Sequence, residues 1–169
     1  MFAKDQAYQN ELSLAEEKTG YNSSIVNVIW DLKEKYNKEN QIDLDKIILK
    51  TGFPKISNVG KDAAKAAFMV IQHADITRQK KYIAVIKDLC EKKEAEWSSY
   101  ALLYDRIQVY DNKKQLYGSQ LKYNDSTQNY ELYPIEDEAN VDKRRKEKGL
   151  NSLADYVIPF GIFYQPVKK

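Results

Sequence analysis

His73, the single histidine of the chain, is the residue best suited to acid–base chemistry. Imidazole titrates naturally near neutral pH, so His73 is a candidate general base or acid. Gln72, a candidate for binding the substrate, precedes it, and Asp75 follows two residues later. Residues two apart do not share a helix face, so Asp75 can orient the ring only if the helix ends at Ala74. The alternative is a buried histidine satisfied by a backbone carbonyl, with Asp75 as the N-cap of the next helix.

A second candidate is the pair Asp105-Arg106, which follows the apolar residues Leu102 and Leu103. Two opposite charges directly after an apolar run indicate that the two side chains face a partly enclosed space. Arg106 would then offer a bidentate fork to an anionic group of a substrate, and Asp105 would be a second carboxylate able to orient His73. An ordinary ion pair with a neighbouring helix explains the same two residues without any ligand.

The third candidate is the segment 115–120, in which amide, phenol and hydroxyl groups surround a glycine. Gln115, Tyr117 and Gln120 are side chains that can hydrogen-bond a substrate or a developing oxyanion. In a regular strand Gln120 faces away from the other two, unless Gly118 marks a bulge. The alternative interpretation is the solvated edge of a hairpin.

Composition excludes several classes of site. One cysteine, Cys90, and one histidine leave no intrachain disulfide and no zinc site of several thiolates or two histidines. The net charge of +2 gives no electrostatic case for binding nucleic acid, and a solvated helix C-terminus explains the basic run 143–148. Neither a glycine-rich phosphate loop nor a GxSxG elbow occurs. We expect no cofactor and no required metal, although His73, Asp75 and Asp105 together could hold a divalent ion.

The long stretches of the chain argue against a membrane protein. No stretch reaches the roughly 18 apolar residues that a membrane span needs, and no signal peptide opens the sequence. A single reduced cysteine agrees with a cytoplasmic protein. The alternative is an exported protein whose leader has been removed, which would show the same sequence. Neither a repeat nor a Gly/Ser or Pro linker divides the chain, so we expect a single domain over residues 1–169.

Hydrophobic periodicity predicts the elements that must position these residues. The fold is expected to be mainly α, an α+β helical bundle with one small antiparallel β-hairpin near residues 115–133. Ser23 or Ser24 should cap a helix that the residues Asn40-Gln41 break, and its steps of three and four predict one buried stripe. The stripe consists of Ile25, Val28, Ile29 and Leu32. Helices are expected near 5–18, 23–38, 43–49, 63–71, 77–93, 95–109, 136–148 and 151–157.

Several short motifs follow one another along the chain. They are Gly52-Phe53-Pro54, Val59-Gly60, Ala66-Ala67-Phe68, Gln72-His73-Ala74-Asp75, Leu102-Leu103-Tyr104-Asp105-Arg106, the segment 115–120, Pro134-Ile135-Glu136-Asp137, and Val141-Asp142-Lys143-Arg144-Arg145 with Gly149-Leu150. As a set they resemble a bacterial domain family of unknown function that is marked by GWP, QHAD, LxDR, QxYGTQ and RRxxxGL motifs. Phe53 stands in place of the tryptophan and Ser119 in place of the threonine. The family has no established reaction, so the resemblance implies only that the polar motifs chosen for their chemistry also define the family.

These residues leave three functions open. If the polar side chains converge on one pocket, we expect hydrolysis or group transfer on a small polar or peptide-like molecule, with His73 as the base or acid. A binding module would use the same pocket without turnover. A structural or interaction protein would instead bury these groups in a hydrogen-bonded network that docks the hairpin on the helices, and its thirteen tyrosines would offer a contact surface.

Overall fold

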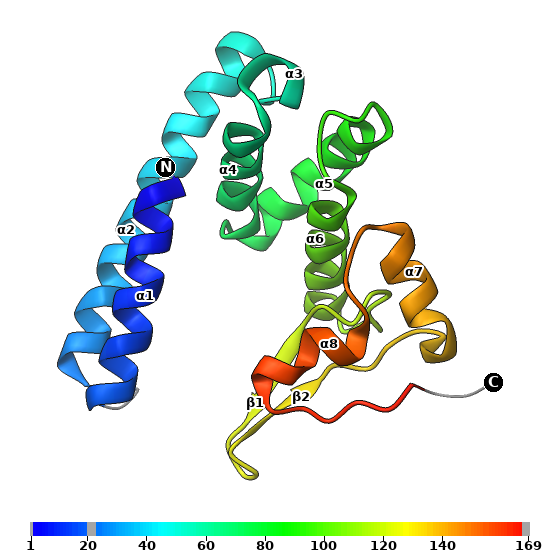
Figure 1. Ribbon diagram of the computed structural model, residues 1–169. Coiled ribbons are helices and arrows are strands. Elements are labelled where there is room, and N and C mark those ends of the chain that lie inside the picture. Colours follow the sequence, from blue (N-terminus) through cyan, green and yellow to red (C-terminus); the bar gives the residue numbers. More distant parts are fainter. Residues whose placement is uncertain (1, 20–22, 167–169) are drawn as a thin grey trace. The chain divides into compact units, whose positions relative to one another are not determined.

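The computed structural model describes residues 2–19 and 23–166, and side chains from residue 11 onward (Figure 1). These residues form eight α-helices, two short 3-10 helices and one two-stranded sheet, which confirms the prediction of a mainly α fold with a small hairpin. The chain divides into two compact units, Met1–Arg78 and Gln79–Lys169. The expectation of a single domain remains a prediction. Among the described helices, none combines the length and the hydropathy of a membrane span.

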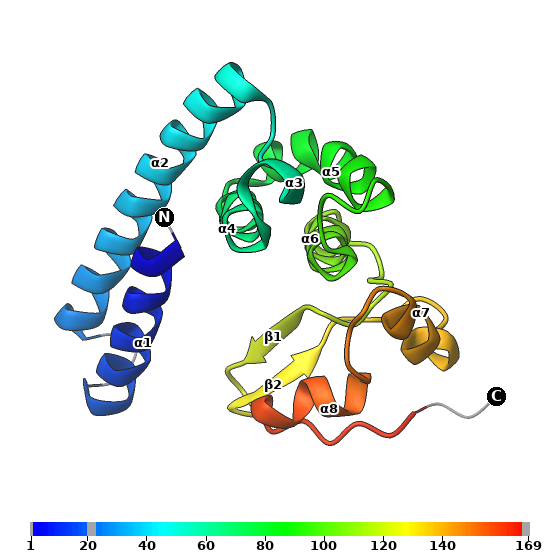
Figure 2. The ribbon, with the colours of Figure 1, turned by 45° about the horizontal axis from the view of Figure 1, so that its top comes forward.

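The first unit is built from α1 (Phe2–Thr19), α2 (Ser24–Thr51), α3 (Ile56–Val59) and α4 (Lys61–Gln72). Figures 1 and 2 both show α1 alongside α2. The hydroxyl of Ser23 caps α2 by accepting the amide of Val26 at 3.3 Å. Two predictions for this helix were wrong: it runs through Asn40-Gln41 without a break, and so includes the short helix expected at 43–49. Asparagine and glutamine cost a helix interior only tenths of a kcal/mol, so packing around Leu44 carries it on to Gly52.

The buried stripe predicted on α2 was also wrong. Ile25 and Val28 are 54% and 58% exposed, whereas Val26 and Leu44 are fully buried. The helix has apolar residues on two faces, and α1 and α4 cover only one of them. Hydrophobic periodicity predicts that a helix has an apolar face. It does not predict which of two apolar faces packs against the neighbouring helices.

The helix α4 is the most buried of the first unit, as predicted, with Phe68 and Ile71 in its core. It ends at His73, and α5 (Ile76–Glu91) begins after Asp75. The carboxylate of Asp75 accepts the amide of Arg78 at 3.0 Å, which confirms its role as the N-cap. The guanidinium of Arg78 in turn pairs with both oxygens of Asp45 on α2, at 2.7 and 2.8 Å.

The second unit continues α5 and adds α6 (Trp97–Tyr110), β1 (Leu121–Asn124), β2 (Asn129–Leu132), α7 (Val141–Glu147) and α8 (Leu153–Val157), with 3-10 turns at Glu138–Asn140 and Ile158–Phe160. The strands pair antiparallel, with Tyr123 opposite Tyr130. Figures 1 and 2 both place α8 beside this hairpin. A small core holds them together; it consists of Ile135, Val141, Leu153 and Val157, with Leu121 and Leu132 packed against it.

The hairpin is shorter than predicted, because residues 115–120 form a loop before β1. Gln115 makes an isolated parallel bridge to Ile135, and the carbonyl of Gln120 accepts the amide of Tyr133 at 3.5 Å. Gly118 has a φ of +65°, which lies outside the strand region. A different set of partners therefore fixes the backbone of this loop. The last helix also differs slightly, since Ser152 rather than Asn151 caps it by accepting the amide of Asp155 at 3.1 Å.

Candidate functional site

The carboxylate of Asp105 organises the loop 115–120. It is fully buried on α6. One oxygen accepts the amides of Leu116 at 2.8 Å and Tyr117 at 3.1 Å. The other accepts the amide of Ser119 at 3.0 Å and its hydroxyl at 2.9 Å. A single carboxylate thus satisfies three backbone donors that a strand would have given to a ladder, which explains why this segment is a loop.

Gln115 closes the same loop from its first residue. Its side chain is fully buried, and its amide nitrogen donates to the carbonyls of Gln120 at 3.1 Å and Tyr133 at 2.9 Å. Its amide oxygen accepts the backbone amide of Gln120 at 2.9 Å. Gln115 therefore connects both ends of the loop, residues 115 and 120, to Tyr133, which directly follows β2. The solvated hairpin edge considered from the sequence is wrong for this residue.

Two arginines hold the carbonyl side of the loop. Arg145 is 1% exposed; it donates to the carbonyls of Tyr117 and Asn151, both at 2.6 Å, and its guanidinium lies 4.8 Å from the ring centre of Tyr156. Arg144 donates to the carbonyl of Leu116 at 2.8 Å. Neither residue was predicted from the sequence, because the basic run 143–148 was interpreted as a solvated helix end. Their place in a motif next to Gly149-Leu150 was the available signal.

Burial controls the electrostatics of this network. Desolvation raises the pKa of Asp105 above its ordinary value, against the hydrogen bonds from Ser119, Leu116 and Tyr117 that lower it. Desolvation also lowers the pKa of the Arg106 and Arg145 guanidinium groups. Arg106 lies half-buried and donates to the side-chain oxygen of Gln120 at 3.3 Å. The sequence left open an ion pair with a neighbouring helix as the alternative for Asp105 and Arg106. The carboxylate of Asp105 instead accepts hydrogen bonds from backbone amides.

The structure therefore brings together five of the eight residues singled out from the sequence. Four of them, Asp105, Arg106, Gln115 and Gln120, form one hydrogen-bonded network. The fifth, Tyr117, contributes its backbone to the network, while its buried ring packs edge-on against Tyr104 at 6.3 Å between ring centres. Asp105 accepts hydrogen bonds from three residues of the loop, and Gln115 bonds to Gln120 and Tyr133, so these side chains support the backbone of the loop.

The other three candidates, Gln72, His73 and Asp75, belong to the first unit. Gln72 is buried, and the half-buried His73 closes α4, with its amide donating to the carbonyl of Met69 at 3.0 Å. The chain does turn at Ala74, as a His73–Asp75 pair requires, but the carboxylate of Asp75 is used to cap α5. Within residues 2–19 and 23–166, no group of three or more His, Cys, Asp or Glu is arranged to hold a metal ion.

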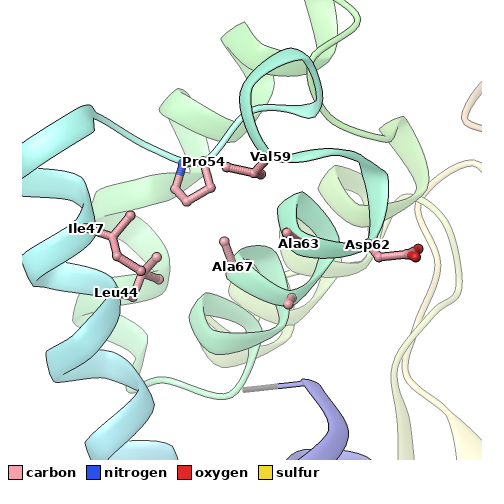
Figure 3. Close-up of a pocket in the computed structure, with 8 residues that line it drawn as sticks. Leu44, Ile47, Pro54, Val59, Asp62, Ala63 and Ala67 are labelled. Carbon is pink, nitrogen blue, oxygen red and sulfur yellow. The ribbon is translucent and has the colours of Figure 1, made fainter.

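The first unit also contains an apolar cavity of about 370 Å³ between α2 and α4 (Figure 3). Its lining consists of Leu44, Ile47, Pro54, Val59, Asp62, Ala63, Ala66 and Ala67. Figure 3 shows Leu44 and Ile47 facing Ala67 across the cavity, whereas the carboxylate of Asp62 points away from them. The loop after α2 and the helix α3 close one end through Pro54 and Val59.

A second, smaller cavity of about 280 Å³ lies between α5 and α6 in the second unit. Its floor is apolar, and the rings of Tyr100 and Tyr104 form one wall, 5.8 Å apart between ring centres. The rest of its lining consists of Ile83, Ala84, Lys87, Ile107 and Gln108. None of the eight candidate residues lines either cavity.

Comparison with known sequences places the chain in a family. Residues 1–164 match the sequence model of a family of unknown function, DUF6624, and the chain belongs to this family. The family expected from the motifs, one of unknown function, is thereby confirmed. No curated protein and no solved structure matches the chain.

Proposed function

We propose that this protein is a non-catalytic binding protein that takes an apolar group of a peptide-like ligand into the cavity between α2 and α4. The observation that carries the proposal is the position of the motif segments of the first unit. Four of the eight lining residues, Pro54, Val59, Ala66 and Ala67, come from the three motifs GFP, VG and AAF. Three of the motif segments of this unit thus contribute to the lining of one apolar space.

The hydrogen bonds of the polar motifs in the second unit argue against catalysis through Asp105. A general base needs a free lone pair within reach of the substrate proton. The oxygens of Asp105 already accept three amides and one hydroxyl, and burial keeps this carboxylate away from solvent. Hydrolysis or group transfer through Asp105 would first have to break some of these hydrogen bonds. Its role in the proposal is to hold the loop in place.

The lining favours an apolar guest. Seven of its eight residues are apolar, and the carboxylate of the eighth, Asp62, points away from the others in Figure 3. A volume of about 370 Å³ falls within the range of ligand pockets, roughly 300–1,000 Å³. Burying one leucine- or phenylalanine-sized side chain contributes about 1.5–3 kcal/mol. One such group alone would bind weakly, so the natural ligand should add backbone contacts around the rim.

The test is a titration of the 15N-labelled full chain with N-acetyl-leucinamide and N-acetyl-phenylalaninamide, followed by amide chemical shifts. We expect saturable shifts concentrated in residues 44–67. Ala63→Leu adds a side chain where the cavity lies, and it should abolish these shifts while the protein stays folded. The control is Ala139→Leu, the same change at an exposed position of the second unit, which should leave them intact. Shifts that are absent, or unaffected by Ala63→Leu, would overturn the proposal.

A further inference from the structure

The second apolar face of α2 is a feature of the first unit that the proposed function does not use. It is an exposed seam, and its apolar side chains are between 36% and 88% exposed. They are Ile25, Val28, Leu32, Ile42 and Leu49. The face that packs inside the unit is a different one, marked by the fully buried Val26 and Leu44.

The spacing of this seam is that of a coiled coil. Positions 25, 28, 32, 35, 39, 42, 46 and 49 follow one another in alternating steps of three and four, the a and d positions of a heptad repeat. Five of these eight positions hold the exposed apolar residues. Lys35, Glu39 and Lys46 occupy the others. A helix with such a seam pairs with another helix through knobs-into-holes packing.

We propose that this seam is the interface of an antiparallel homodimer, in which α2 lies against α2 of a second copy of this chain. When the two helices are aligned about Asn37, Ile25 faces Leu49 of the partner subunit, and Leu32 faces Ile42 of the partner subunit. Lys35 then faces Glu39 of the partner subunit. The two-fold axis repeats each pair, so the contact is isologous and closes on itself.

Charge complementarity favours a second copy of this chain as the partner of α2, and it favours the antiparallel orientation of the two helices. Lys35 and Glu39 are exposed, and the structure shows no ion pair for either one among the residues it describes. In the antiparallel register they meet as opposite charges, twice per dimer. A parallel pair would instead stack Lys35 on Lys35 and Glu39 on Glu39, which is unfavourable. The same alignment that pairs the charges also pairs the apolar residues.

The remaining layer sets Val28 against Lys46 of the partner subunit. The ammonium of Lys46 already pairs with Asp43 of its own helix at 3.0 Å, so its aliphatic stem is free to cover valine while the charge stays in water. At 1.5 Å per residue, the 28 residues of α2 extend over about 42 Å. The seam runs along most of that length, which is long enough for a stable helix pair.

The first experiment is sedimentation equilibrium of the full chain over a series of protein concentrations. We expect a monomer–dimer equilibrium that Leu32→Asp removes, because this change places a carboxylate against Ile42 of the partner subunit. Trp30→Asp is the control: Trp30 is 49% exposed on the same helix but does not belong to the seam. Circular dichroism checks that both variants keep their helices. A chain that stays monomeric, or a dimer that survives Leu32→Asp, would overturn the proposal.

A charge swap tests the direction of the pairing. Lys35→Glu alone sets two carboxylates against each other at both symmetry-related contacts, and we expect the dimer affinity to fall about tenfold. Glu39→Lys alone should act similarly. The double variant Lys35→Glu/Glu39→Lys restores opposite charges only in the antiparallel register, and its affinity should return to that of the natural chain. Loss of affinity in the single variants without recovery in the double variant would contradict the antiparallel dimer.

Discussion

Asp105 and Arg145 hold opposite sides of one residue, Tyr117. The amide of Tyr117 donates to both oxygens of Asp105, at 3.1 and 3.2 Å, and its carbonyl accepts Arg145 at 2.6 Å. Asp105 lies on α6 and Arg145 on α7, so the backbone of one loop residue connects two helices. Two buried charges of opposite sign are thus satisfied by the N–H and the C=O of one residue, which belong to consecutive peptide groups. The stability of the second unit should depend on each member of this arrangement.

Asp105→Asn is the first test of that dependence. The amide nitrogen of asparagine would face backbone N–H groups that need an acceptor, so buried donors would lose their partner. We expect a loss of about 3 kcal/mol in the free energy of unfolding, measured with urea. Amide exchange of Leu116 and Ser119 should accelerate as well. Asp125→Asn, in the exposed hairpin turn, is the control and should stay within about 0.5 kcal/mol of the natural chain. A similarly small loss for Asp105→Asn would show that this carboxylate does not support the loop.

Gly118→Ala separates crowding from backbone strain. Gly118 has a φ of +65°, and a Cβ there would lie 2.8 Å from Cδ1 of Leu153. Gly149 has a similar φ of +70°, but a Cβ there would meet nothing within 4 Å. Gly149→Ala should therefore cost only the left-handed backbone conformation, about 1 kcal/mol. Gly118→Ala should cost about 1–3 kcal/mol more, because Leu153 is fully buried and has to move. Equal melting temperatures of the two variants would contradict the close packing of loop and α8.

Arg145→Lys keeps the positive charge but removes the guanidinium group, whose nitrogens donate to two carbonyls at once. One ammonium cannot reach the carbonyls of both Tyr117 and Asn151 and also lie over the ring of Tyr156. We expect a loss of about 2 kcal/mol in thermal or urea unfolding. Lys143→Arg, the reverse exchange at an exposed position of the same helix, should have no measurable effect. If both variants unfold alike, the buried position of Arg145 does not contribute to stability.

Local chemistry made several features predictable. Asp75 caps α5 and Ser23 caps α2 because a short polar side chain can satisfy the first amides of a helix next to it in sequence. Gly149 follows α7 with a left-handed φ for a similar local reason. The alternative that the polar motifs form a buried hydrogen-bonded network was also open from the sequence, and the contacts of Asp105 and Gln115 agree with it.

Contacts between distant segments could not be predicted. Residues 115–120 have the composition of a strand, but Asp105, about ten residues earlier, draws their amides away from a ladder. Arg145 resembles its solvated lysine neighbours in sequence, and only the carbonyl of Tyr117 and the ring of Tyr156 make its burial possible. The continuity of α2 through Asn40-Gln41 depends on packing around Leu44 rather than on local propensity.

The thiol of Cys90 provides the last test, because burial raises its pKa to about 11. The side chain is 2% exposed, and its sulfur donates to the carbonyl of Glu96 at 3.4 Å. In the unfolded chain the thiol loses its proton near pH 8.5. The unfolded state therefore ionises first, and stability should fall as the pH rises from about 8.5 to 11; Cys90→Ala should lack this component. Iodoacetamide at pH 8, followed by mass spectrometry, should label the native chain far more slowly than the chain in urea, since the thiolate is the nucleophile. Labelling of the native chain at the rate of the unfolded one would show that Cys90 is not enclosed between α5 and the start of α6.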